Sequence, residues 1–430
     1  MPSSHSMTKR LLENLLTKKT LQEYENNLRS VFPLEKALPP RIPGGTDWSL
    51  AAQKNRIKLL QNIQKISLSQ LSGEGPAEDP LAFQGNIENF VGMTLIPTGV
   101  MGPLRVNGLE AKGDFYIPMA TTEGALVASY QRGALLSSLS GGIRALCSVE
   151  QVQRAPCFLF ENAIEAGKFI AWVTEHFEDV KKVASQQSRH AVLEEVRVYL
   201  NGNWVYLILG YNTGDASGQN MVTLCTDAVC RAMASGSPIP PKQWFVEGNL
   251  SGDKKATAAS FLLVRGKLVT AEVCIPKNLV RRVLHTTPEN MVRYWTVSIV
   301  GGIQSGSIGV QGHYANGLAA IYLACGQDVA CVAEAAVGVT RMSVTEKGDL
   351  YVSITLPNLI VGTVGGGTRL ATQRECLALM ECLGDGKARK FAEICAAAVL
   401  AGEISIIGSL AAGDFAAAHA AFGRPKKARS

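Results

Sequence analysis

The sequence has little charge and none of the common metal-binding signatures. Only 18% of its 430 residues are charged, and the formal net charge of +6 is small for this length, so the composition does not indicate a nucleic-acid partner. The ten cysteines include no Cys-x-x-Cys, and the six histidines include no His-Glu-x-x-His. We therefore expect no metal site, and we interpret the cysteines as small core residues of a protein in a reducing cytoplasm.

Long apolar runs and the usual nucleotide-binding turns are missing as well. The apolar C-terminal region is interrupted by Glu393, Glu403 and Asp414, which leaves no run of about 18 apolar residues that could cross a membrane. The N-terminus carries no secretory signal pattern. There is no P-loop, and the glycines of 362–368 lack the Gly-x-Gly-x-x-Gly spacing. We expect a soluble protein without a membrane segment, which holds any dinucleotide without a Rossmann turn.

The pattern of residue types changes along the chain. Its 47% hydrophobic content is enough for two or three packed units. Residues 1–90 show helical spacing of apolar side chains, which predicts a helical N-terminal domain. Residues 147–245 alternate helical segments with β-branched strands. They contain a hairpin signal at Asn201-Gly202-Asn203, and together these features predict an inserted α+β unit.

The rest of the chain predicts one larger domain. It comprises residues 91–146 and 259–430. A helix expected near 391–407 is rich in small side chains, so we expect it to pack closely against its neighbours in the core. A loop at 246–258, which carries Lys254, connects the small unit to the large domain. The predicted fold class is α+β.

Four segments supply the groups that reduction of a thioester needs. An ammonium stabilises an oxyanion, a carboxyl group protonates a carbonyl oxygen, and an imidazole protonates a leaving thiolate. The candidates are Lys254, the acids Glu123 and Asp328, and His419. Each also has a plain structural interpretation: the acids cap helices, the lysine is solvated and the histidine is incidental.

The acids need particular surroundings to act as proton donors. We expect Glu123 in the first turn of a helix capped by threonine, which lowers its pKa unless burial or a second acid such as Asp328 opposes that effect. Asp328 follows Gly326, where we expect a helix to stop and the aspartate to cap the next one. Asn316 would lie about 18 Å from Asp328 on a straight helix, so only a break at Gly326 lets both reach one site.

Two further segments suit a phosphorylated dinucleotide. Residues 214–220 place backbone amides at a helix start beside Asp215, Ser217, Gly218 and Asn220, which suits a ribose or pyrophosphate. Ser188-Arg189 could bind a 2′-phosphate, because a guanidinium matches that group. Asp, Ser and Asn also make ordinary helix caps.

Together these segments resemble the 3-hydroxy-3-methylglutaryl-coenzyme A reductase family, of the type found in eukaryotes, archaea and some bacteria. The resemblance runs in the same order from about Asn89 to His419 and covers the catalytic portion only. The matching segments are 118–124, 252–255, 324–328, 362–368 and 410–413.

The resemblance implies a fold and an activity. The fold is a helical N-terminal domain and a large domain around a central helix, with an inserted ferredoxin-like small domain that binds NADP. The activity is reduction of an acyl-CoA thioester to a primary alcohol by two NADPH, most simply of hydroxymethylglutaryl-CoA to mevalonate plus CoA. The family implies a homodimer or dimer of dimers with active sites between subunits, in the cytoplasm.

The resemblance also implies a role for each site residue. Glu123 donates a proton to the carbonyl oxygen, Lys254 stabilises the oxyanion and Asp328 tunes both, while His419 protonates the CoA thiolate. Lys255 binds the substrate carboxylate. The other residues expected at the substrate are Asp253, Asn316, Arg132 and Glu247. Those expected at NADPH are Ser188, Arg189, Asp215, Ser217, Gly218, Asn220, Gly365 and Gly366.

Some positions depart from the family pattern. The family usually has Met at Ser217 and Gln219, and Ser at Glu247, where the side chain helps to hold the substrate carboxylate. The arginine that some members use for that carboxylate aligns with Leu146, two residues from Arg144. Unless Lys255 or a proton neutralises it, a carboxylate at Glu247 would repel an anionic acyl group.

These departures leave two alternatives open. One is a divergent biosynthetic reductase that acts on an acyl thioester without the distal carboxylate, or on one with a cation that pairs with Glu247. The other is a catalytically silent protein that binds CoA or a nucleotide.

Overall fold

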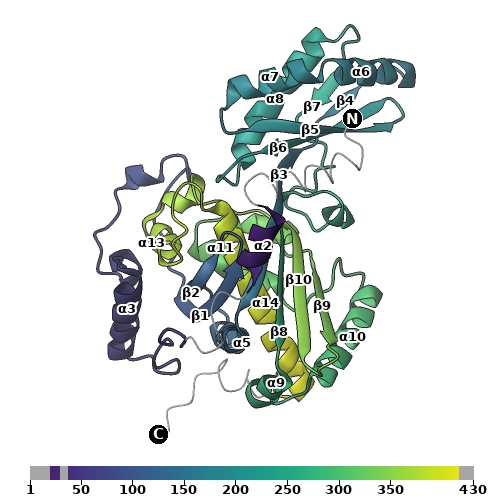
Figure 1. Ribbon diagram of the computed structural model, residues 1–430. Coiled ribbons are helices and arrows are strands. Elements are labelled where there is room, and N and C mark those ends of the chain that lie inside the picture. The colour runs from purple at the N-terminus through teal and green to yellow at the C-terminus, as the bar shows by residue number, and fades with distance from the viewer. Residues whose placement is uncertain (1–19, 30–36, 416–430) are drawn as a thin grey trace.

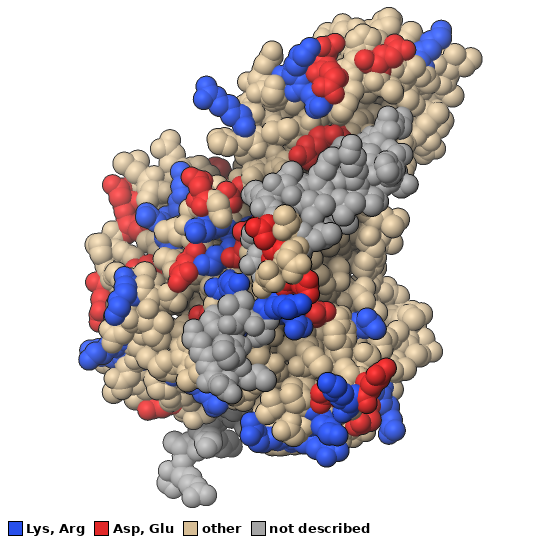
Figure 2. Space-filling view, in the orientation of Figure 1, with Lys and Arg blue, Asp and Glu red and all other residues tan. Residues whose placement is uncertain are grey.

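The computed structural model describes residues 20–29 and 37–415, and it divides into a large body and a smaller unit that projects from it (Figure 1). The two parts have separate hydrophobic cores. Helices and strands are mixed throughout, so the predicted α+β class is confirmed. On the face drawn in Figure 2, basic and acidic side chains are interspersed.

Short helices precede the large body. They are α2 (Leu21–Leu28), α3 (Leu50–Gln64), α4 (Ser69–Ser72) and the 3₁₀ helix η1 (Pro80–Phe83). Thr20 forms a capping box with Glu23 at the start of α2, and Ser49 caps α3. Within residues 20–29 and 37–90 the regular elements are all helices, as the spacing predicts. The exact domain limits stay a prediction.

The large body combines a sheet with covering helices. Its strands are β1 (Thr98–Gly108), β2 (Lys112–Ala120), β3 (Ile143–Arg154), β8 (Gly266–Ile275), β9 (Val339–Val344) and β10 (Leu350–Leu359). Its α-helices are α5 (Leu126–Leu139), α9 (Lys277–Leu284), α10 (Pro288–Ser305), α11 (Tyr314–Ala324), α12 (Val332–Ala335), α13 (Ala371–Leu379) and α14 (Ala388–Ala412). Short 3₁₀ helices are η2 (Ala258–Phe261), η3 (Val329–Cys331) and η4 (Gly366–Arg369).

The smaller unit contains β4 (Cys157–Leu159), α6 (Ala163–Glu175), α7 (Phe177–Gln187), β5 (Val192–Asn201), β6 (Trp204–Asn212), α8 (Gln219–Gly236) and β7 (Gln243–Phe245). The hairpin predicted between β5 and β6 is present, because Asn201 pairs with Trp204 and Gly202 has a positive φ of 61°. The long strand β3 joins the two parts: it pairs with β1 and β8 in the large body, and its end pairs with β6.

Helix α14 is the central helix of the large body. It packs against β8, β10, α5 and α11 (Figure 1). A Cβ on Gly133 of α5 would lie 1.8 Å from the carbonyl oxygen of Ala401, so only glycine allows this close helix contact. By length and composition α14 could cross a membrane, but 83% of its most apolar window is buried inside the protein. It therefore serves here as a core helix.

Candidate active site

The side chains of Lys254 and Asp328 form an ion pair. Nζ of Lys254 lies 2.8 Å from Oδ2 of Asp328, and the two side chains are 43% and 35% exposed. Asp328 also caps η3, because its Oδ1 accepts from the backbone N–H of Ala330 at 3.1 Å. The hydrogen bond to Asp328 raises the pKa of Lys254 above its ordinary value. The lysine is therefore an ammonium that still faces open space.

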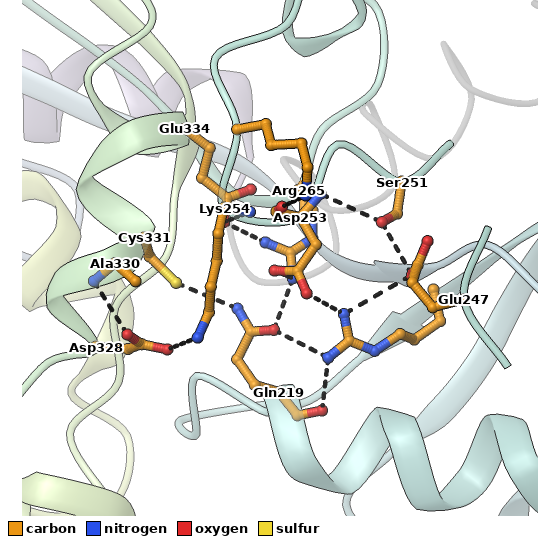
Figure 3. Close-up of polar contacts among 12 residues, drawn as sticks. Gln219, Glu247, Ser251, Asp253, Lys254, Arg265, Asp328, Ala330, Cys331 and Glu334 are labelled. Carbon is orange, nitrogen blue, oxygen red and sulfur yellow. Dashed lines mark hydrogen bonds and ion pairs between the residues drawn. The ribbon is translucent and has the colours of Figure 1, made fainter. Parts of the chain in front are cut away.

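A buried cluster fixes the loop beneath Lys254 (Figure 3). The Asp253 carboxylate lies between two arginines, 2.7 Å from Nη1 of Arg154 and 2.7 Å from Nη2 of Arg265. Arg265 also pairs with Glu334, and both side chains are 1% exposed. Glu334 accepts from the backbone N–H of Lys254 at 3.2 Å, while burial raises its pKa. Asp253 is thus part of the support of Lys254, although the sequence places it among the substrate-binding residues.

Glu247 lies beside Arg154 rather than beside Lys255. Its Oε2 is 3.9 Å from Nη1 of Arg154 and accepts from the hydroxyl of Ser251 at 3.0 Å. Nζ of Lys255 instead donates to the backbone oxygen of Asp253 at 2.9 Å. Two backbone N–H groups complete the set around Glu247, those of Ala155 at 3.2 Å and Asn249 at 2.7 Å. These hydrogen-bond donors stabilise the charge of Glu247, so it repels an anionic acyl group less than a carboxylate without partners would.

Arg154 is the residue that sequence reasoning missed. The alignment leaves Leu146 and Arg144 near the acyl position, but Arg144 donates to the backbone oxygen of Leu28 at 2.9 Å and lies 3.5 Å from Glu272. The arginine beside the Lys254 loop is the last residue of β3. No local pattern marks it, because its partners come from distant parts of the chain.

Gln219 connects the start of α8 to the same arginines. Its Oε1 accepts from Arg265 at 2.6 Å and from Arg154 at 3.4 Å (Figure 3). Its Nε2 donates to Sγ of Cys331 at 3.4 Å. This departure from the family pattern therefore ties α8 to the cluster that holds Asp253.

Glu123 lies in a turn before α5, and the predicted position in the first helical turn is wrong. The helix begins at Leu126, because Ala125 has a positive φ of 70° and no side chain caps the helix. Thr121 does accept from the backbone N–H of Glu123 at 3.0 Å, but as part of the turn. Asn316 donates to both carboxylate oxygens of Glu123, at 3.2 and 3.1 Å.

The pair Lys254–Asp328 and the pair Glu123–Asn316 lie in different parts of the large body. Helix α11 carries Asn316 near its start, while Asp328 follows its end, after a break at Gly326 with φ of 66°. Glu123 lines cavities of about 320 and about 400 Å³, and neither includes Lys254 or Asp328. Asp328 lines a third cavity, of about 700 Å³. The roles that the resemblance implies need Glu123, Lys254 and Asp328 at one carbonyl group, but within a single chain Glu123 and Asp328 line separate cavities.

Arg132 belongs to the Glu123 cavity. Its Nε donates to the hydroxyl of Ser405 at 3.0 Å and its Nη2 to the backbone oxygen of the same residue at 2.8 Å. Burial lowers its pKa from the ordinary value. Its guanidinium is therefore held against α14 at the wall of this cavity.

The largest of these cavities brings the two expected cofactor loops together. Its lining includes Ser217, Gly218 and Asn220 from one loop and Gly365 and Gly366 from the other, with Asp328 beside them. Nothing lies within 4 Å of a Cβ built on either Gly365 or Gly366, so this side of the loop is open. The N-terminus of the 18-residue helix α8 faces the same cavity, which suits a phosphate group.

Asp215 does not line this cavity. Its Oδ2 accepts from the backbone N–H of Gly386 at 2.7 Å and its Oδ1 from that of Ala388 at 2.9 Å. The carboxylate therefore stabilises the N-terminus of α14. The structure thus gives Asp215 a structural contact, and its role at the cofactor stays a prediction.

The other predicted site residues either line none of these three cavities or fall outside the residues that the structure describes. Ser188 ends α7, where its hydroxyl accepts from the backbone N–H of His190 at 3.1 Å, and Arg189 is exposed. His419 lies outside the described residues. Within residues 20–29 and 37–415, no group of three or more His, Cys, Asp or Glu side chains could hold a metal ion.

Comparison with known proteins gives consistent matches. The family model "Hydroxymethylglutaryl-coenzyme A reductase" matches residues 52–424. The 3-hydroxy-3-methylglutaryl-coenzyme A reductase of Aeropyrum pernix is 44% identical over 375 residues, 84% of this chain and 89% of that protein. The enzyme of the same name from Pyrococcus abyssi is 43% identical over 387 residues, 88% of this chain and 94% of that protein.

A solved structure has the same fold. It is the class II 3-hydroxy-3-methylglutaryl-CoA reductase of Streptococcus pneumoniae bound to NADPH, with a TM-score of 0.66 and 19% identity. The match covers 83% of this chain and 96% of that one.

Proposed function

This chain belongs to the hydroxymethylglutaryl-coenzyme A reductase family, and we propose that it reduces hydroxymethylglutaryl-CoA to mevalonate and CoA at the expense of two NADPH. One observation carries the proposal. The ammonium of Lys254 is paired with Asp328, and Asp328 lines the cavity formed by the two cofactor loops. A group that stabilises an oxyanion thus lies beside the space suited to a hydride donor.

NADPH, when bound, supplies the hydride for each of the two reductions. The residues that would hold it are Ser217, Gly218 and Asn220 with Gly365 and Gly366, through backbone amides at the start of α8 and an open glycine loop. Ser188 and Arg189 would contact the 2′-phosphate, for which a guanidinium is suited.

Side chains of the protein stabilise charge and transfer protons during the reaction. Lys254 stabilises the negative charge that develops on the carbonyl oxygen, and Asp328 positions the ammonium and raises its pKa. Glu123 gives its proton to that oxygen, with Asn316 holding the carboxyl group in place. His419 protonates the departing thiolate. Lys255 contacts the distal carboxylate of the acyl group.

A second copy of the chain completes the site. In one chain Glu123 and Asn316 line one cavity and Asp328 lines another, yet the Glu123–Asn316 pair and the Lys254–Asp328 pair are both needed at the same carbonyl group. A homodimer, or a dimer of dimers, in which the first pair of one subunit faces the second pair of its partner resolves this separation. We place this assembly in a reducing cytoplasm, since all ten cysteines are free.

A second candidate substrate follows from Glu247. Its carboxylate already lies beside Arg154, so the arginine is less available to an anionic acyl group than it would be beside a serine. An acyl-CoA whose far end is neutral or cationic would suit this arrangement. The catalytic groups would be the same.

A panel of acyl-CoAs tests these proposals. Purified protein is incubated with NADPH and each acyl-CoA, and NADPH oxidation, CoA release and the alcohol formed are measured. We expect hydroxymethylglutaryl-CoA to consume two NADPH for each CoA released. Turnover of only a neutral or cationic acyl-CoA would favour the second candidate, and no turnover of any thioester would favour a silent binding protein.

A further inference from the structure

His313 is a buried histidine next to the Glu123 cavity with one ring nitrogen unused. It immediately precedes α11, and its side chain is 9% exposed. Its ring packs near that of Tyr130, with centroids 5.3 Å apart. It lines the cavity of about 320 Å³ together with Glu123, Arg132 and Asn316.

The other ring nitrogen is held by Glu403 from the middle of α14. Glu403 is fully buried, and its Oε1 accepts from the backbone N–H of His313 at 2.8 Å and lies 3.1 Å from Nδ1 of the same residue. Its Oε2 accepts from the backbone N–H of Gly312 and from the hydroxyl of Thr340, both at 2.8 Å. Since every neighbour of this carboxylate donates to it, Nδ1 of His313 carries the hydrogen.

This arrangement leaves Nε2 of His313 as an acceptor, on a residue that lines the cavity. A carboxylate on one ring nitrogen is the usual means of fixing the tautomer and direction of a working imidazole. Nε2 is buried and has no hydrogen-bond partner in the described part of the chain. A purely structural histidine needs only the contact to Glu403, whereas a buried nitrogen without a partner is costly.

We propose that Nε2 of His313 accepts a hydrogen bond from the hydroxyl group that forms at the reacting carbon of the substrate. The inference rests on the proposed function. Glu123, in the same cavity, protonates the carbonyl oxygen, and the resulting O–H is the donor that Nε2 lacks. The contact forms as the oxygen is protonated, so it lowers the barrier without tightening substrate binding. It operates in both hydride transfers, since each one gives a hydroxyl group at the reacting carbon: first that of the hemithioacetal, which then loses CoA to give the aldehyde, and later that of the alcohol.

Two substitutions separate this role from a structural one. His313→Asn places an amide N–H where Nδ1 lies, which keeps the bond to Glu403, but it removes Nε2. His313→Gln places an amide oxygen near the Nε2 position instead. For each variant we would measure kcat and KM with hydroxymethylglutaryl-CoA and with the aldehyde intermediate, the NADPH dissociation constant and the Tm.

We expect His313→Asn to lower kcat by roughly 10- to 100-fold on both substrates, with KM, NADPH binding and Tm close to those of the wild type. His313→Gln should retain more activity. A kcat of His313→Asn equal to that of the wild type would overturn the inference, as would losses in both variants that follow the fall in Tm.

A second measurement needs no variant. In protein labelled with ¹⁵N-histidine, the Nε2 signal of His313 should shift when mevalonate and CoA bind, and an unchanged signal would overturn the inference. If the wild type is inactive on hydroxymethylglutaryl-CoA, the proposed function fails. The same comparison is then made with the best acyl-CoA of the panel, and equal rates there would overturn the role of His313.

Discussion

Nζ of Lys254 lies 2.8 Å from Oδ2 of Asp328, and this contact raises the pKa of the lysine and holds its ammonium beside an aspartate that lines the cavity of about 700 Å³. The aspartate reaches it because Gly326 breaks the chain after α11 and Asp328 caps the next short helix. One carboxylate therefore has two tasks: Oδ1 fixes the backbone and Oδ2 fixes the ammonium.

Asp328→Asn separates these two tasks. The amide oxygen can still cap η3, so we expect little change in Tm. The carboxylate that positions the ammonium of Lys254 is lost, so kcat should drop by about 100-fold or more, and the pKa of Lys254 should fall toward its ordinary value. Steady-state kinetics and thermal unfolding of the variant check both expectations. A kcat near that of the wild type would remove Asp328 from the mechanism.

Glu247→Ser tests the departure at the acyl position. Removing the carboxylate leaves Arg154 paired with Asp253 alone and takes one negative charge away from the acyl position, so we expect KM for hydroxymethylglutaryl-CoA to fall by about 10-fold. Glu247→Gln is the matched variant, since it loses only the charge and keeps an acceptor for the neighbouring N–H groups. KM for a neutral acyl-CoA should not change. If neither variant alters KM for the anionic substrate, Glu247 does not influence acyl recognition.

Mixed subunits test where the site forms. Glu123→Gln and Lys254→Ala should each be inactive alone, but a co-expressed mixture contains dimers with one unaltered site, so activity should return to about a quarter of the wild type. The control mixture is Lys254→Ala with Asp328→Asn, which alters the same half of every site and should stay inactive. Recovery in neither mixture would contradict an active site shared between subunits.

The pH dependence of stability has an identifiable source in Glu393. Burial raises the pKa of this carboxyl group from 4.5 to about 7, although the backbone N–H groups of Glu110, Ala111 and Cys147 donate to it. The folded protein therefore binds this proton more tightly than the unfolded chain does. The free energy of unfolding contributed by Glu393 is highest below pH 4.5 and falls as the pH rises through about 7.

Glu393→Gln should remove this contribution. The Tm of the wild type is measured across the same pH window as that of the variant, and the Tm of the variant should fall less as the pH rises. The amide can satisfy fewer of the three N–H donors, so its Tm should also be lower overall. Parallel pH profiles would show that Glu393 does not titrate in this range.

The features that could be predicted from the sequence depend on local chemistry. The β5–β6 hairpin follows from Asn201-Gly202-Asn203, and the cap at Asp328 follows from Gly326, because the chain needs a positive φ at both glycines. The predicted start of α5 was wrong because Ala125 adopts a positive φ. No residue type at this point of the sequence indicates that conformation.

Other contacts could not be predicted because their partners are far apart in sequence. Arg154 gains its role from Asp253 and Glu247, both contributed by the loop that leads back to the large body. Asp215 binds the N-terminus of α14, more than 170 residues away. The carboxylate of Glu403 fixes His313 from the central helix. Only the tertiary structure brings these groups together.

The central claim is that the ammonium of residue 254 stabilises the oxyanion during reduction. The most direct test compares Lys254→Ala with the matched variant Lys255→Ala in single-turnover reduction of hydroxymethylglutaryl-CoA, with NADPH binding measured in parallel. We predict that Lys254→Ala binds NADPH normally but reduces the thioester at least about 1000-fold more slowly, while Lys255→Ala mainly raises KM. Near-normal reduction by Lys254→Ala would contradict the account.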